Sequence, residues 1–127
     1  MLQNHEAIAT IAVKDLNAAN KFYGETLGLK KVDKDGEEAT TFQAGNSKLF
    51  VYRSQFAGTN KATAVSWPVG NEIEEVVRSL KSKGVTFEHY DMPGMKREGD
   101  IHVADEMKAA WFKDPDGNIL GLVSGKP

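Results

Sequence analysis

The chain has 127 residues, of which 40% are apolar and 27% are charged, and its formal net charge is −2. This length and balance predict a single globular domain over residues 1–127. The weak negative charge argues against a nucleic-acid partner, because phosphate binding requires clustered positive charge. The absence of cysteine excludes disulfides and thiolate chemistry. No basic leader and no apolar run of membrane-spanning length is visible, so we expect a cytoplasmic protein without a membrane partner.

The first half of the chain predicts one strand, one helix and three more strands. Residues 7–13, "AIATIAV", are rich in β-branched and small apolar side chains, as is typical of a strand. Asp15 is expected to cap a helix that Gly28 ends in the left-handed conformation. The further strands are expected over residues 29–34, 38–44 and 48–54, with the last two forming a hairpin around "GNS".

The second half repeats this order of elements. Residues 62–69 predict a strand, and Asn71 is expected to cap a helix with Glu74 completing a capping box and Gly84 ending it. The strands that follow are expected over residues 85–90, 109–113 and 118–124, the last two joined by the turn "DPDG".

The same spacing of 56 residues separates Asp15 from Asn71 and Gly28 from Gly84. Two caps and two stops at one offset indicate two tandem βαβββ units, approximately 5–56 and 61–125. The predicted fold class is α+β: a curved eight-stranded mixed sheet around a cleft, with the helices on its convex side. An α+β sandwich without duplication is the alternative, with the spacing then a coincidence.

Two segments resemble those of a known family. "VKDLNAANKFYGETLGLK" and "AAWFKDPDGNILGLV" are similar to the two best-known segments of the vicinal oxygen chelate superfamily, which includes glyoxalase I, extradiol dioxygenases and bleomycin-resistance proteins. The resemblance implies this fold over nearly the whole chain. It also implies a homodimer as the usual assembly. It does not select one chemistry, because the superfamily hosts many.

In metal-dependent members of that family, four strands supply His, Gln or Glu ligands to one divalent ion. The resemblance places these positions at Ile8, Tyr52, Ala64 and Gly121. Three of these residues have no donor atom in the side chain, and the phenol of Tyr52 is a poor ligand because its ordinary pKa is about 10. We therefore expect no metal and no cofactor at these positions.

Strand parity outward from these positions predicts a concave face made of small, aromatic and hydroxyl side chains, a composition suited to a small organic ligand. Gly121 is expected to leave free room there, and Tyr52 to offer a hydrogen bond. The same aromatic residues would also serve as ordinary core packing. The candidate ligand-binding residues are Ile8, Thr10, Phe50, Tyr52, Ala64, Ser66, Trp67, Met107, Trp111 and Gly121.

Three residues are weak candidates for catalysis: Tyr52, His102 and Glu106. His102 is expected in a long polar loop over residues 91–108, where a histidine among carboxylates would act as a ligand or general base. This loop is interpreted either as a lid or as a surface excursion.

The first functional hypothesis is a protein that binds a small organic molecule in its cleft without a metal. The second is a glyoxalase-like lyase or an oxygenase with a relocated metal or acid–base site around His102 and Glu106. The third is a non-catalytic interaction protein whose cleft is filled by its own side chains.

Overall fold

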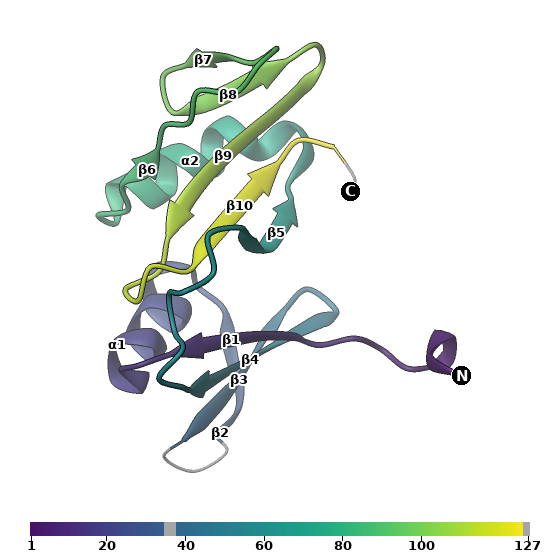
Figure 1. Ribbon diagram of the computed structural model, residues 1–127, viewed down its shortest axis with the longest axis vertical. Coiled ribbons are helices and arrows are strands. Elements are labelled where there is room, and N and C mark those ends of the chain that lie inside the picture. Colours follow the sequence, from purple (N-terminus) through teal and green to yellow (C-terminus); the bar gives the residue numbers. More distant parts are fainter. Residues whose placement is uncertain (35–37, 126–127) are drawn as a thin grey trace. The chain divides into compact units, whose positions relative to one another are not determined.

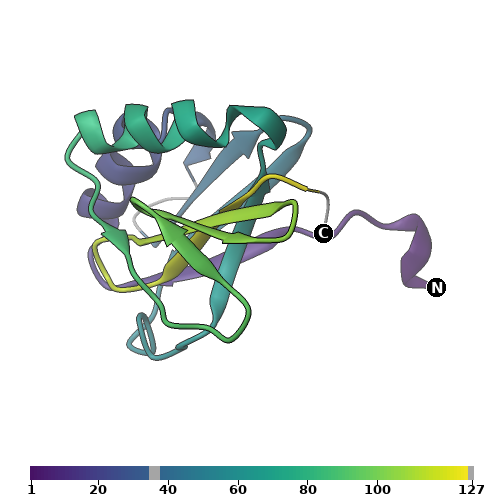
Figure 2. The same cartoon turned by 90° about the horizontal axis from the view of Figure 1, so that it is seen from above.

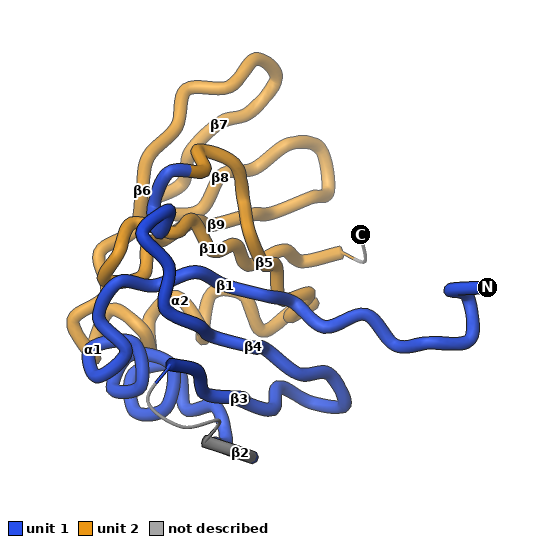
Figure 3. Tube along the Cα trace, turned by 60° about the horizontal axis from the view of Figure 1, so that its bottom comes forward, with its two compact units in different colours: residues 1–59 blue, residues 60–127 orange. Residues whose placement is uncertain are grey.

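The computed structural model describes residues 1–34 and 38–125. The chain divides into two compact units, residues 1–59 and residues 60–127 (Figure 3). The elements of unit 1 are, in chain order, η1 (Leu2–Asn4), β1 (Ala9–Val13), α1 (Leu16–Lys21), η2 (Phe22–Thr26), β2 (Lys30–Lys34), β3 (Ala39–Ala44) and β4 (Ser47–Arg53).

Unit 1 is a four-stranded sheet with the order β1-β4-β3-β2, in which only β1 and β4 run parallel. Ile11 and Val13 of β1 are buried together with Leu49 and Val51 of β4, and α1 packs against β3 and β4. The alternate residues of these strands face the other way. The sequence pattern therefore predicted the parity of this sheet correctly.

The helix of unit 1 begins where the sequence predicts. The side chain of Asp15 accepts a hydrogen bond from the Ala18 N–H at 3.1 Å, which satisfies one of the free donors of the first turn. After Lys21 the helix widens into the π-helical turn η2, which carries the fully buried Tyr23. Gly28 follows at φ 74°, so the predicted left-handed stop is confirmed.

Unit 2 contains more strands than the four that the sequence predicts. Its elements are, in chain order, β5 (Thr63–Pro68), η3 (Gly70–Glu72), α2 (Ile73–Ser82), β6 (Phe87–Glu88), β7 (Lys96–Glu98), β8 (Ile101–Ala104), β9 (Met107–Lys113) and β10 (Ile119–Val123). They form a six-stranded sheet ordered β5-β10-β9-β8-β7, with β6 also paired to β9. The α+β class with a βαβββ core in each unit is confirmed, and unit 2 adds a hairpin to that core.

The added hairpin corrects the prediction of a long loop over residues 91–108. Gly99 and Asp100 form a two-residue turn between β7 and β8, with Glu98 paired to Ile101. A second two-residue turn, at Asp105 and Glu106, joins β8 to β9, and Asp105 takes a positive φ of 53°. Short turns with Gly or Asp in the left-handed region suit antiparallel strands, so this segment pairs into the sheet.

The start of α2 also differs from the prediction. The residue before the helix is Glu72, and its side chain makes no capping hydrogen bond. Asn71 lies inside the 3₁₀ turn η3, so the expected capping box with Glu74 is not made; Glu74 instead pairs with Lys108. Gly84 ends the helix region at φ 93°, as predicted.

One face of α2 covers the sheet of unit 2. Its buried residues Ile73, Val77 and Leu80 face the strands, among which β9 contacts the helix. Figures 1 and 2 show α2 lying along one face of this sheet. Among the residues that the structure describes, no helix combines the length and the apolar character needed to cross a bilayer.

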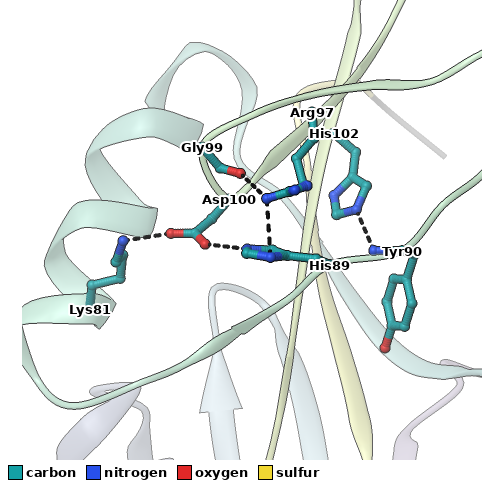
Figure 4. A network of polar contacts seen from close by, with 7 residues as sticks. All are labelled: Lys81, His89, Tyr90, Arg97, Gly99, Asp100 and His102. Atoms are coloured by element: carbon teal, nitrogen blue, oxygen red, sulfur yellow. Dashed lines mark hydrogen bonds and ion pairs between the residues drawn. The ribbon is translucent and has the colours of Figure 1, made fainter.

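A network of ionic hydrogen bonds attaches the C-terminal half of α2 to the turn between β7 and β8 (Figure 4). The carboxylate of Asp100 lies 2.6 Å from Lys81 Nζ and 2.7 Å from His89 Nε2. His89 Nδ1 lies 3.1 Å from an Arg97 nitrogen, which can only donate, so the ring hydrogen lies on Nε2 and is donated to Asp100. The Lys81 ammonium has the largest effect on the pKa of Asp100 and the His89 ring the next largest, and both lower it below its ordinary value.

We expect Asp100→Asn to lower the free energy of unfolding by about 1 kcal/mol at pH 7, the upper range for a solvent-screened pair. Because the pKa of Asp100 is lower in the folded state, its contribution is complete above the unfolded value, near 3.8, and is lost as pH falls through the folded value. Urea unfolding between neutral pH and about pH 2 measures this, and the gap between wild type and variant should close in acid. Asp91→Asn, an exposed aspartate nearby, is the control. A gap for Asp100→Asn that stays constant with pH would contradict the assignment.

Candidate ligand-binding pocket

Unit 2 contains an open pocket of about 500 Å³. Such a volume is in the range of small-molecule sites. The lining combines two aromatic side chains, one of them a phenol, with several apolar side chains, one aliphatic hydroxyl, one ammonium and one carboxylate group. The lining residues are Lys61, Ala62, Thr63, Tyr90, Asp91, Met92, Trp111 and Ile119.

Strand register brings the sheet residues of this pocket to one face. Gly121 of β10 pairs with Trp111 of β9 on one side and with Ser66 of β5 on the other. Ile119 pairs with Thr63 on the same face. The register then shifts by one residue in β5, and Ala64 is the extra residue at this irregularity.

The side chain of Trp111 lies across the backbone of Gly121. A Cβ atom at Gly121 would lie 3.3 Å from Trp111 Nε1 and 3.3 Å from Ser66 Oγ, closer than side chains normally pack. The indole N–H donates a hydrogen bond to Thr63 Oγ1 at 3.1 Å. The prediction of free room above Gly121 is therefore wrong: the missing side chain makes room for the indole, which spans β10 to reach β5.

The Trp111 indole belongs to a cluster of three rings. The ring of Tyr90 lies 5.5 Å from it at 70°, and the ring of His102 lies 4.9 Å from it at 75°, both in edge-to-face geometry. Burial is the main cause that raises the pKa of Tyr90 above its ordinary value, and the negative charge of Glu88 raises it further. The phenol therefore stays neutral at physiological pH. Tyr90 and Trp111 of this cluster line the pocket and give it an aromatic wall.

The prediction that His102 lies in a loop is wrong. It lies in β8, its exposed fraction is 1%, and its Nε2 accepts a hydrogen bond from the Tyr90 N–H at 2.9 Å. Glu106 is exposed and lines a second pocket of about 370 Å³ together with Glu74, Met107 and others. The structure therefore does not bring His102 and Glu106 into one acid–base site.

The remaining sheet residue proposed for this face, Trp67, points the other way. It pairs with Leu122, so strand parity places it on the side opposite Gly121. Ser66 does share the face of Gly121 and contacts the position a Cβ would take there.

The candidates in unit 1 share a face of their own sheet. Thr10 pairs with Phe50, and Tyr52 follows on the same side, its ring stacked on Phe50 with centroids 6.0 Å apart. Ile8 precedes β1 in an extended N-terminal segment and is 52% exposed. None of these residues lines the pocket of unit 2.

The four positions implied for a metal do not fit one. Ile8, Ala64 and Gly121 offer no side-chain donor, and Tyr52 offers only a phenol. Within residues 1–34 and 38–125, no three His, Asp or Glu side chains gather as a potential metal-binding group.

Several lining residues were missed by the sequence analysis: Lys61, Ala62, Thr63, Tyr90, Asp91, Met92 and Ile119. Ile119 was detectable, because it lies two residues from Gly121 in the same strand. Thr63 was not, because the bulge at Ala64 breaks the alternation between Thr63 and Ser66. The direction of Tyr90 was not detectable, since β6 ends before it and its main chain is held by a side chain.

We expect Gly121→Ala to lower the free energy of unfolding by about 1–3 kcal/mol, because the new methyl group displaces the indole from Thr63. Chemical denaturation followed by tryptophan fluorescence measures this. In a Trp111→Phe background the same substitution should cost less, since the close contact with Nε1 is gone and that with Ser66 Oγ remains. Equal costs in both backgrounds would contradict the proposed packing.

The fold is shared with solved structures of low sequence identity. An integron cassette protein from the Halifax Harbour sewage outfall metagenome is 22% identical with a TM-score of 0.71, covering 94% of this chain and 99% of its own. The fosfomycin resistance protein FosX from Mesorhizobium loti is 12% identical with a TM-score of 0.71, and the match covers 99% of this chain and 95% of FosX. The lactoylglutathione lyase from Agrobacterium tumefaciens is 17% identical with a TM-score of 0.68, and the match covers 94% of this chain and 92% of the lyase. No curated protein matches the sequence. Residues 4–122, however, match the sequence pattern of a family, and the chain belongs to the Glyoxalase/Bleomycin resistance protein/Dioxygenase superfamily.

Proposed function

We propose that this protein binds a small, planar organic molecule in the pocket of unit 2 and does so without a metal ion. The observation that carries the proposal is the Trp111 indole, which lies next to Gly121 and is held there by its hydrogen bond to Thr63. A flat aromatic surface fixed before binding lowers the entropy that association costs. The chemistry of the remaining lining fits an organic ligand with one polar end.

The polar groups of the lining lie among apolar ones. Thr63 accepts from the indole, so its own hydroxyl hydrogen is available to another acceptor. Lys61 and Asp91 are exposed and offer one charge of each sign. Such a pocket favours a ligand with a planar apolar body and a polar or charged substituent.

The enzyme alternative receives less support. It needs an acid–base pair or a relocated metal, but His102 is buried with Nε2 engaged, and Glu106 lines a different pocket. The similarity to FosX and to lactoylglutathione lyase lies below 25% identity and carries the fold alone. The interaction protein and the homodimer stay predictions.

We expect Trp111→Ala to weaken binding of a planar aromatic probe at least about tenfold, because a central aromatic wall of a binding site contributes on this scale. A neutral, an anionic and a cationic probe (2-naphthol, 2-naphthoate and tryptamine) should be titrated by NMR. Trp67→Ala is the matched control, since this tryptophan faces the other side of the same sheet, and it should change affinity less than about twofold. Equal effects of the two substitutions would place the ligand elsewhere.

Addition of Zn²⁺, Ni²⁺, Mn²⁺ or Fe²⁺ should leave thermal stability unchanged. A metal bound at 100 times its dissociation constant would add about 2.7 kcal/mol, which a melting curve resolves easily. A clear stabilisation at stoichiometric metal that Tyr52→Phe abolishes would refute metal-independent binding at the family's position. The same stabilisation lost in His102→Gln would support the relocated site.

A further inference from the structure

The aromatic wall of the pocket includes Tyr90, whose main chain is not paired with a neighbouring strand. β6 ends at Glu88, so Tyr90 lies beyond the last ladder pair of that strand. Its N–H donates instead to the imidazole Nε2 of His102 at 2.9 Å. A side chain of β8 therefore replaces the missing backbone acceptor.

The chemistry of this hydrogen bond fixes the state of the His102 ring. A nitrogen that accepts from an N–H carries no hydrogen, so His102 is neutral with its hydrogen on Nδ1. Nδ1 is buried and has no hydrogen-bond partner in the described part of the chain. The ring also packs edge-on against Trp111 and lies 6.1 Å from the ring of Tyr90.

His89, the residue before Tyr90, is bound on the opposite side of the main chain by Asp100. Successive residues of an extended segment point in opposite directions, so His89 turns toward Asp100 while Tyr90 turns toward Trp111. Figure 4 shows the contact of His89 with Asp100 and that of the Tyr90 N–H with His102, with the Tyr90 phenol directed away from the two histidines. The β7–β8 hairpin thus anchors two consecutive residues, His89 through Asp100 and Tyr90 through His102.

We propose that His102 is a positioning residue of the pocket: its Nε2 accepts the Tyr90 N–H and so holds the Tyr90–Met92 wall in line with Trp111. This role deepens the proposed function and rests on it. The segment from Tyr90 to Met92 supplies three of the lining residues. It follows the end of β6, so no strand pairing holds its main chain, and the hydrogen bond to His102 is made at its first residue. Without the acceptor, a part-buried N–H is left without a partner and the segment leaves its place beside Trp111.

The role of Nε2 is separable from mere packing by two substitutions. In His102→Gln the side-chain oxygen can occupy a place near that of Nε2 and keep an acceptor there, whereas His102→Leu fills a similar volume without one. His5→Leu, in the exposed N-terminal segment, is the control. The variants are compared by the exchange rate of the Tyr90 amide hydrogen and by the affinity for 2-naphthol.

We expect the Tyr90 amide to exchange about tenfold faster, and 2-naphthol to bind about fivefold more weakly, in His102→Leu, the scale of one lost hydrogen bond. His102→Gln should restore both readouts to near the wild-type values. Unchanged exchange in a folded His102→Leu, or equal losses in both variants, would overturn the proposal.

A measurement on the unaltered protein decides the question if His102→Leu does not fold. Long-range ¹H–¹⁵N correlation of the imidazole distinguishes the two tautomers, and Nε2 should be the nitrogen without hydrogen. A hydrogen on Nε2 would overturn the proposal. If wild-type protein binds none of the probes, the proposed function fails, while amide exchange and the tautomer still decide whether His102 holds Tyr90.

Discussion

The hydrogen bond from the Trp111 indole to Thr63 is the interaction on which the pocket depends. It joins β9 to β5 across the intervening strand β10, and it is possible because Gly121 presents no side chain in between. A glycine in a strand interior normally weakens the strand, since it packs nothing and loses more entropy on folding. Here the cost is offset by an aromatic ring that takes the place of a side chain at that position.

The rest of the pocket is arranged around this ring. Tyr90 meets it edge-on and is held by His102, which itself packs against the same indole. The β7–β8 hairpin carries His102 and, through Asp100, also fixes the residue before Tyr90. The sequence left residues 91–108 open as a lid or a surface excursion; the structure places there a hairpin whose side chains bind His89 and the Tyr90 N–H.

The fold, and a few of the residues that line the pocket, could be predicted from the sequence. Alternation in β1 and β4 predicted which residues are buried, and the segments around "FYGETLG" and "DPDGN" indicated the superfamily that residues 4–122 match. The strand position of Gly121 was also correct. These features follow from local patterns of two or 3.6 residues and from turn chemistry, which single letters reveal.

What was missed depends on contacts between distant segments. The bulge at Ala64 shifts the parity of β5, so Thr63 and Ser66 share one face although they are three positions apart. The "GD" turn at Gly99 was a readable hairpin signal that the charged residues around it obscured. The direction of the Trp111 ring and the acceptor of the Tyr90 N–H are set by side chains 48 and 12 residues away, which no local pattern contains.

The most direct test of this account is a map of amide and indole chemical shifts during titration with 2-naphthol or 2-naphthoate. The largest changes should fall on the Trp111 indole N–H and on the amides of Thr63, Tyr90 and Met92. Changes that instead centre on Phe50 and Tyr52, with the Trp111 indole unaffected, would contradict it.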